Sequence, residues 1–563
     1  MNAPTKPFRS FLRTLLCGGA CVFATLTTLH AGSATWNVNP ATSDWNTAAN
    51  WTPQTVPNGL ADVATFDLSN NAAVSLSASV QASLVFNSGA SAYTITIPTT
   101  EVLTINSPGI TNNSGILQEF LADTGSGAGA LIHFNAGSAG NLTHFDILGG
   151  SIPTSKVEFF SFSTAGSATI DLEGSSVRNT DGGIMNFNDF SSAASSNIIA
   201  HAGIGAQGGI STVSFFDSST AGSATITVEG GAARNAIGAG LFFYDTSKAG
   251  TSTITVNGGQ TAGALHSVLS FVGSSTADHA LITANSGVDE GGEIDFENNG
   301  GNGGTAQIQL LGKGSLDISG TGNFSPSINI GSLSGNGGLV FLGAKALSVG
   351  SNSLDTVFSG ILQDGGRGGG TGGTLTKVGD GALTLRGAST YTGLTTVSAG
   401  TLVAANKTGS ATGTAAVNVN AGRIGGNGTI AGSLTLGTGA GSGSKLVPRL
   451  VSKPTIVFTV GSSLTFNSDA TYSDTFSSVQ NTTDSVTANG VTINGARATF
   501  KDRQPATLAS GTVFTVINNT AATPIVGTFS NLADGATMTI GSNTYQANYE
   551  GGDGNDLTLT VVQ

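Results

Sequence analysis

The sequence predicts an all-β protein, a parallel β-helix (β-solenoid) with 28-residue coils and a β-rich cap at its C-terminal end. The first observation behind this prediction is a set of columns in which one residue type recurs every 28 positions. The second is the alternation of apolar and polar residues within each repeat, which is the period of a strand with one buried face. A propeller blade needs about 40 to 45 residues, so a 28-residue unit favours one solenoid coil. The columns are Phe159, Phe187, Phe215, Phe243 and Phe271; Ile170, Ile198, Ile226, Ile254 and Ile282; Ser163, Ser191, Ser219, Ser247 and Ser275; and Ala165, Ala193, Ala221, Ala249 and Ala277.

Stacking of the coils predicts what each column does. Equivalent strands of neighbouring coils lie about 4.8 Å apart, so we expect the Phe and Ile columns to form ladders inside the solenoid. The Ser and Ala columns are expected to line a tight turn. The register runs from about Leu142 to Ile282 and shortens to 26 residues at Ile308. Because a solenoid grows by adding coils, the 563 residues need no series of separate globular cores.

The N-terminus has the features of an export signal. Three cations precede an apolar run from Leu15 to Leu29, and small residues follow at positions 31–34. This order predicts a secretory signal peptide that is cleaved near Ser33 or Ala34. An uncleaved membrane anchor is disfavoured, because the run is short for a span and contains glycine and threonine. A lipid anchor at Cys21 is disfavoured because Gly18 takes the place of the expected large aliphatic residue.

Composition limits the kinds of partner that the mature chain is expected to bind. Both cysteines, Cys17 and Cys21, lie in the signal peptide, so the mature chain is predicted to contain neither disulfides nor thiolate metal sites. Removing the signal takes the formal net charge from −13 to −16, because that segment carries Lys6, Arg9 and Arg13 and no carboxylate. An acidic chain of this kind disfavours nucleic acid and anionic lipid as partners.

The chain divides into five predicted parts. All three tryptophans, Trp36, Trp45 and Trp51, lie near the mature start. Their rings suit a cap over the open end of a solenoid, and a carbohydrate-stacking platform is the alternative. The last part loses the 28-residue period but keeps strand alternation, which favours continuation of the solenoid with a terminal cap. The parts are residues 1–34, signal peptide; 35–83, N-terminal cap and first strands; 84–345, solenoid with 28-residue repeats; 346–440, solenoid continuation with a second repeat at 372–403; and 441–563, C-terminal β-rich region or cap.

The second repeat, GGTLTKVGDGALTLRGASTYTGLTTVSAGTLV, closely resembles the autotransporter-associated β-strand repeat. The opening region with Pro57, Asp62 and Phe66, and the C-terminal segment from Phe529, also resemble the ends of exported proteins that carry this repeat. The resemblance implies a right-handed β-helical, passenger-like protein that a Gram-negative-type bacterium displays or secretes. Autotransporters end in a translocating barrel of many strands, and about 160 residues follow the repeat here, so we expect no self-transport. The matching residues are Leu375, Thr376, Lys377, Gly379, Leu383, Leu385, Gly387, Tyr391, Gly393, Thr396, Val397, Gly400 and Leu402.

One column contains three carboxylates. Asp189, Asp217 and Asp245 follow each other at 28 residues, flanked by Ser161 and Gly273. Stacked about 5 Å apart, they would repel one another and raise one another's pKa. Three interpretations remain: a solvated ladder of turn residues, which we favour, a calcium site built from hard oxygen ligands, or an acid and base pair for catalysis.

Two further motifs have a structural interpretation. One column contains two glutamates, a histidine between them and two asparagines, and is either an ion-paired ladder or a proton-transfer group. The asparagines favour the ladder, because stacked side-chain amides hydrogen-bond along the axis. The segment GGDGND matches the start of a calcium-binding nonapeptide, but no second copy follows, so a tight turn is favoured. The other mature histidines show no metal-ligand spacing. The column is Glu173, His201, Glu229, Asn257 and Asn285; the segment is 551–556; the other histidines are His133, His144, His266 and His279.

The sequence therefore predicts an exported structural or adhesive surface β-solenoid without catalytic activity. The alternative is a carbohydrate-active β-helix enzyme, a polysaccharide lyase or hydrolase, or a glycan-binding protein. No nucleophile elbow, phosphate loop, zinc motif or nucleotide fingerprint occurs, so we predict no catalytic, cofactor-binding or metal-ligating residue and no cofactor. Cell-surface components or glycans are the expected partners, with no nucleic acid and no membrane span after signal cleavage.

Overall fold

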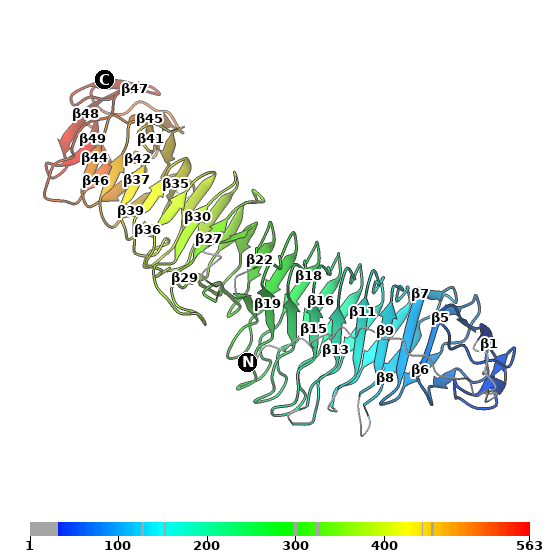
Figure 1. Ribbon diagram of the computed structural model, residues 1–563. Coiled ribbons are helices and arrows are strands. Elements are labelled where there is room, and N and C mark those ends of the chain that lie inside the picture. Colours follow the sequence, from blue (N-terminus) through cyan, green and yellow to red (C-terminus); the bar gives the residue numbers. More distant parts are fainter. Residues whose placement is uncertain are drawn as a thin grey trace, which may run out of the picture.

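The computed structural model describes residues 32–124, 129–150, 154–178, 180–297, 301–320, 322, 327–441, 443–451 and 455–563. The predicted signal peptide falls almost entirely outside these ranges. Over the described residues the chain forms short strands and one 3-10 turn, η1 (Ala48–Asn50). The strands stack into a long rod with the tryptophan-rich region at one end and the C-terminus at the other (Figure 1). No described helix is long and apolar enough to cross a bilayer.

Two sheets run along the N-terminal part of the rod. Sheet 1 has 15 strands, in spatial order β2 (Trp51–Thr52), β1 (Ala34–Trp36), β3 (Val63–Phe66), β5 (Val80–Phe86), β7 (Val102–Asn112), β9 (Leu131–Asn135), β11 (Lys156–Phe160), β13 (Ile184–Phe187), β15 (Thr212–Phe215), β17 (Gly240–Phe243), β19 (Val268–Val272), β21 (Glu293–Glu297), β23 (Ser315–Asp317), β26 (Leu339–Phe341) and β29 (Ile361–Gln363). Sheet 2 has 11 strands, in the order β25 (Ser332–Ser334), β22 (Gln307–Leu310), β20 (Leu281–Ala284), β18 (Thr253–Val256), β16 (Thr225–Val228), β14 (Asn197–Ala200), β12 (Thr169–Leu172), β10 (Thr143–Ile147), β8 (Gln118–Ala122), β6 (Thr94–Ile97) and β4 (Ala73–Ser75).

Three sheets form the C-terminal part. Sheet 3 contains β24 (Ser327–Ile330), β27 (Ala346–Val349), β30 (Thr374–Lys377), β32 (Thr395–Val397), β34 (Val417–Val419), β37 (Leu434–Leu436), β40 (Leu464–Phe466) and β44 (Val491–Ile493). Sheet 4 contains β28 (Thr356–Phe358), β31 (Ala382–Leu385), β33 (Thr401–Ala404), β35 (Gly422–Gly426), β38 (Ser444–Leu446), β41 (Ala470–Ser477) and β42 (Thr482–Thr483), with β45 (Arg497–Asp502) paired to β41. Sheet 5 contains β36 (Thr429–Ile430), β39 (Val457–Val460), β43 (Ser485–Ala488), β46 (Val513–Asn519), β49 (Asp556–Val561), β48 (Asn543–Gly551) and β47 (Thr537–Ile540).

The 28-residue register is confirmed as the spacing of adjacent parallel strands. Phe187 pairs with Phe215, and Phe215 with Phe243, while the Ile column pairs in the same way across sheet 2. The Phe rings are fully buried and stack face to face, with centroids 4.6 Å apart between Phe187 and Phe215 and 4.7 Å between Phe215 and Phe243. The predicted slip to 26 residues is also present, because Ile282 pairs with Ile308. The core is therefore a set of side-chain ladders along the axis.

The cross-section of the rod changes near residues 302–345. In the N-terminal coils sheets 1 and 2 are joined by a tight turn whose residues form single bridges, such as Thr220 to Lys248. From β24 onward a full sheet, sheet 3, is present, and the coils shorten: Leu375 pairs with Thr395, and Thr395 with Val417. The rod therefore continues with a different set of sheets.

Both ends of the rod are capped. At the N-terminal end Trp36, Trp45 and Trp51 are at most 1% exposed and pack on each other with ring centroids 5.0 Å apart. These rings are core, which contradicts the carbohydrate-platform alternative. At the C-terminal end the parallel stack continues to β46, after which β49, β48 and β47 return antiparallel. Antiparallel strands at the end of the stack cover part of the open solenoid end, and the predicted C-terminal β-rich cap is confirmed.

Candidate functional site

A cluster of carboxylates lies on the outer face of sheet 1. Ile294 and Phe296 point into the core, so the alternation of β21 turns Glu293, Asp295 and Glu297 outward. Asp295 pairs in register with Asp317 of the next coil. Parallel stacking thus brings together carboxylates that are 20 residues or more apart in sequence.

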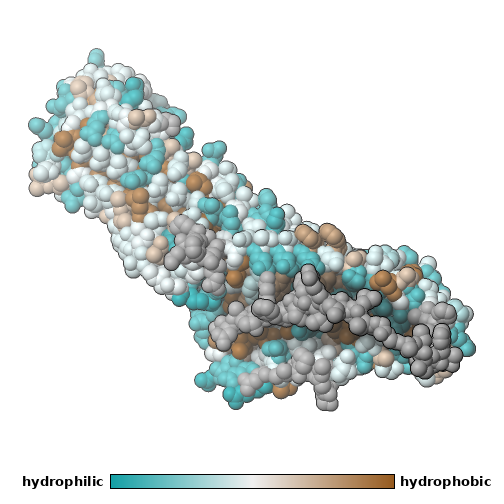
Figure 2. Space-filling view, viewed as in Figure 1, coloured by the Kyte–Doolittle hydropathy of each residue, from teal (hydrophilic) through white to brown (hydrophobic). Residues whose placement is uncertain are grey.

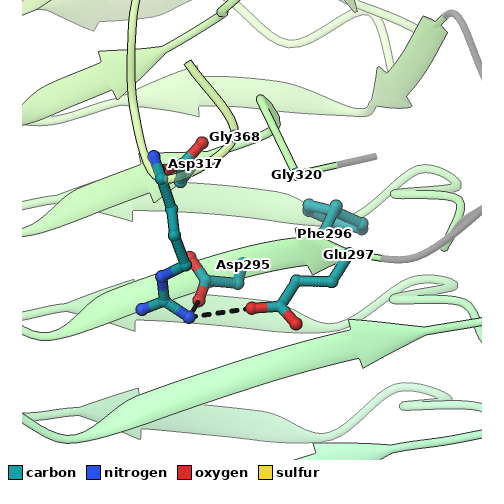
Figure 3. A pocket seen from close by; sticks show the side chains of 7 residues that line it. Asp295, Phe296, Glu297, Asp317, Gly320 and Gly368 are labelled. Atoms are coloured by element: carbon teal, nitrogen blue, oxygen red, sulfur yellow. Dashed lines mark hydrogen bonds and ion pairs between the residues drawn. The ribbon is translucent and has the colours of Figure 1, made fainter. Parts of the chain in front are cut away.

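A glycine-rich segment covers this cluster. Residues 364–373, which we call the strap, leave β29 and fold back over the outer face of sheet 1 toward β23 and β21. The backbone N–H of Arg367 donates to Asp317 Oδ2 at 2.7 Å, and the N–H of Gly368 donates to Ser319 Oγ at 2.8 Å. The strap, Asp317 and β21 enclose a cavity of about 180 Å³ (Figure 3).

The guanidinium of Arg367 is the cationic centre of the cavity. Its Nη2 donates to Glu293 Oε2 at 2.8 Å, and its Nη1 donates to Glu297 Oε1 at 2.8 Å and lies 2.9 Å from Asp295 Oδ2. Glu293 also contacts His266 Nε2 at 2.8 Å. One strap residue therefore ion-pairs with three carboxylates of a coil about 70 residues earlier in the chain.

Burial dominates the electrostatics of the cluster. The Asp295 side chain is 2% exposed, and desolvation together with the charge of Glu293 raises its pKa well above the usual range. Burial also acts on Glu293, but the hydrogen bond from His266 and the charge of Arg367 outweigh it, so the pKa of Glu293 is lowered. The hydrogen bond to Glu293 raises the pKa of His266. Asp295 therefore keeps its proton more readily than Glu293 does.

This geometry decides what the cluster can do chemically. Oxygen atoms of Glu293, Asp295 and Asp317 lie within 4.8 Å of one another, a spacing that suits a cation. The guanidinium of Arg367 already supplies positive charge to Glu293 and Asp295. A protonated Asp295 has the chemistry of a general acid, but its burial under the strap keeps substrate atoms away. The ion pairs of the cluster therefore hold the strap against the outer face of sheet 1.

Sequence reasoning did not find this cluster. No column or repeat in the sequence links Arg367 to β21. The available signal was a pair of carboxylates, Glu293 and Glu297, around Asp295 at the strand period.

The predicted aspartate column lies at a turn on the solenoid edge. Asp189, Asp217 and Asp245 have φ values of 58°, 54° and 55°. The carboxylate of each accepts from the backbone of the preceding coil: Ser161 N–H donates to Asp189 at 2.9 Å, Asp189 N–H to Asp217 at 3.2 Å and Asp217 N–H to Asp245 at 3.2 Å. These contacts support the turn-ladder interpretation. We call these three residues the aspartate ladder.

The histidine column forms an ion-paired ladder on the outer face of sheet 2. His201 Nδ1 lies 2.9 Å from Glu229, and its Nε2 lies 3.7 Å from Glu173. The predicted amide ladder is present, since Asn285 Nδ2 donates to Asn257 Oδ1 at 2.8 Å. The hydrogen bond to Glu229 raises the pKa of His201.

His144 extends this network in a way that the sequence did not indicate. Its two ring nitrogens lie 2.6 Å from Glu119 and 2.9 Å from Asp171, carboxylates of the coils on either side. The hydrogen bonds to Asp171 and Glu119 raise the pKa of His144 to about 9. Both histidines therefore link carboxylates of neighbouring coils.

The segment 551–556 forms the turn between β48 and β49, as predicted. The Asn519 N–H donates to Asp556 Oδ1 at 2.8 Å, so this carboxylate anchors the turn to β46.

The comparisons with known proteins bear on the second repeat. Residues 375–404 match the passenger-associated-transport-repeat family. The predicted autotransporter-associated repeat is thereby confirmed over this segment. A comparison with curated protein sequences gives no match.

Among solved structures, the chain is similar to the Hap adhesin of Haemophilus influenzae, with 11% identity and a TM-score of 0.24. The alignment covers 90% of this chain and 65% of that one. The chain thus spans less than two thirds of the length of this relative. At that TM-score the two backbones do not superpose as whole molecules, and the likeness carries no weight for function.

The structure explains several residues of the matched repeat. Leu375, Leu383 and Tyr391 are at most 1% exposed and form the core of the shorter coils. Lys377 also points inward, and its Nζ donates to the carbonyl oxygens of Val378 at 2.6 Å and Gly379 at 2.7 Å. Burial lowers the pKa of this ammonium. These positions serve the coil and its turn rather than a ligand.

Proposed function

We propose that the protein is an exported structural or adhesive β-solenoid without catalytic activity, secreted or held at the cell surface, whose function lies in its extended outer surface. The passenger-associated repeat at residues 375–404, set in register within a continuous stack of parallel strands, is the observation that supports this proposal. Its expected partners are cell-surface components or glycans.

The physical properties of the rod suit such a role. The paired strands of each coil stack on those of its neighbours, so a long surface is built by adding coils. The face in view in Figure 2 mixes hydrophilic and neutral residues with scattered hydrophobic ones. Single exposed apolar residues of this kind are ordinary for a protein surface.

Fractionation of the native host tests export. We expect a chain processed near Ser33 or Ala34, outside the cytoplasm and released by carbonate washing. Full-length chain in the cytoplasm would refute export. Beads coated with residues 35–563 should then adhere to host or neighbouring cells more strongly than uncoated beads, and equal adherence would refute an adhesive role.

A carbohydrate-active enzyme is the second candidate, and the carboxylate cavity under the strap is the observation in its favour. If Asp295 were a general acid, Asp295→Asn would abolish polysaccharide cleavage while leaving the fold intact. We expect no cleavage by either protein, because the Asp295 side chain is buried beneath Arg367. Cleavage by the wild type that disappears in the variant would establish the enzyme.

A further inference from the structure

A second hollow lies on the outer face of sheet 4, across the matched repeat and the coils that follow it. It measures about 410 Å³ and is lined by Asp380, Gly400, Thr401, Gly422, Arg423, Gly443 and Lys445. This volume falls within the range of ~300–1,000 Å³ that is usual for small-ligand sites. The strands involved, around β35, occupy the yellow part of the rod in Figure 1.

Glycines keep the floor of the hollow free of side chains. Gly400, Gly422 and Gly443 start successive coils with φ values of 66°, 83° and 89°. A Cβ at Gly400 would lie 2.3 Å from the carbonyl oxygen of Gly379, and one at Gly422 would lie 2.4 Å from that of Gly400. Close approach of the coils therefore requires glycine here.

Cations gather in one column beside this floor. Thr401 pairs with Arg423, Arg423 with Lys445, Lys445 with Thr471 and Thr471 with Arg497, all on the outer face of sheet 4. We call Arg423, Lys445 and Arg497 the cationic column. All three are exposed, and within the described residues none of their side chains has an ion pair or hydrogen bond.

Like charges stand next to each other in this column. Arg423 and Lys445 pair on adjacent strands, where like charges repel. The carboxylate of Asp469, near the same edge, accepts the backbone N–H groups of Thr438, Gly439 and Gly441 and forms no ion pair with the column. An anionic ligand would relieve the repulsion.

The mixture of groups indicates what kind of anion fits. Arg423 can hold a carboxylate through two parallel hydrogen bonds, while Asp380 and Thr401 on the other side of the hollow accept or donate to hydroxyl groups. An acidic sugar supplies one carboxylate and several hydroxyls.

We propose that this hollow and the cationic column bind a uronic acid-containing polysaccharide, with the chain laid along the solenoid axis. The inference rests on the proposed function, since it names the partner of the displayed surface. The sugar carboxylates would contact Arg423 and Lys445, and hydroxyls would contact Asp380 and Thr401.

Calorimetric titration of residues 35–563 with polygalacturonate oligomers tests the proposal. The double variant Arg423→Gln/Lys445→Gln should bind at least tenfold more weakly than wild type. The matched control Arg234→Gln/Lys248→Gln removes the same two charges from exposed positions in the 28-residue coils and should bind as wild type does. Unchanged melting of both variants would show that the fold is retained.

Four outcomes would overturn the inference: no binding of polygalacturonate by wild type, equal loss in both double variants, tighter binding of dextran sulfate, which contains no uronic acid, or tighter binding of single-stranded DNA than of polygalacturonate. The bead assay separates this inference from the proposed function. Wild-type beads that adhere while polygalacturonate fails to bind would overturn the inference alone. Polygalacturonate binding by a protein found only in the cytoplasm would overturn the proposed function alone.

Discussion

Replacing Phe215 by alanine tests the ladder that holds the coils together. The ring is fully buried between Phe187 and Phe243, with centroid distances of 4.6 and 4.7 Å and interplanar angles of 3° and 4°. Buried Phe→Ala changes cost about 3–5 kcal/mol. Collapse of the site is limited, because the coils above and below keep their own Phe rings. We therefore expect a loss of about 4 kcal/mol, and a larger loss for Phe215→Asp, which adds an unpaired buried charge.

Hydrogen exchange with mass spectrometry is the suitable assay, because a solenoid need not unfold in a single step. Protection should fall in β13, β15 and β17 and remain unchanged in the C-terminal cap. Phe190→Ala is the control: Phe190 is 60% exposed and stacks on Phe162 at 5.3 Å, so its loss should cost under ~1 kcal/mol. Equal effects of Phe215→Ala and Phe190→Ala would refute the ladder.

Three further predictions follow from the polar contacts between coils. Asparagine at all three positions of the aspartate ladder should leave the melting temperature equal or higher. An amide oxygen still accepts the backbone N–H, and the repulsion between like charges is removed. If calcium raises the melting temperature of the wild type and not of the variant, the ladder is a metal site instead. The pKa of His144 is raised to about 9, so the stabilisation that its protonated ring provides is fully present below pH ~6.5 and is lost as the pH rises through about 9. We expect this loss to be about 1 kcal/mol after solvent screening. His144→Gln should flatten the alkaline loss of stability in urea titrations, and an unchanged pH profile would contradict the prediction. Arg367→Ala should lower the free energy of unfolding by about 2 kcal/mol and raise hydrogen exchange in the strap, because Asp295 loses its partner. The exposed control Arg386→Ala should change neither quantity. A strap that stays protected in Arg367→Ala would show that the ion pairs do not hold it in place.

The sequence by itself determined the parts of the fold that repeat. A column such as Phe187, Phe215 and Phe243 specifies its own strand partners, because a one-residue slip would turn every ring toward solvent. The same regularity predicted the slip at Ile308. It also predicted the turn ladder as the favoured interpretation of Asp217, since all its partners lie one coil away at the same period.

Only the tertiary structure decided the contacts that break the period. Arg367 reaches β21 because the strap folds back across two intervening strands, and no repeat relates position 367 to position 295. His144 finds carboxylates at spacings of 25 and 27 residues, which fall outside the 28-residue columns. The burial of Trp45 depended on how the first coil closes over its own end. Ladder positions are set by local register, whereas loops, caps and irregular coils take their partners from the path of the whole chain.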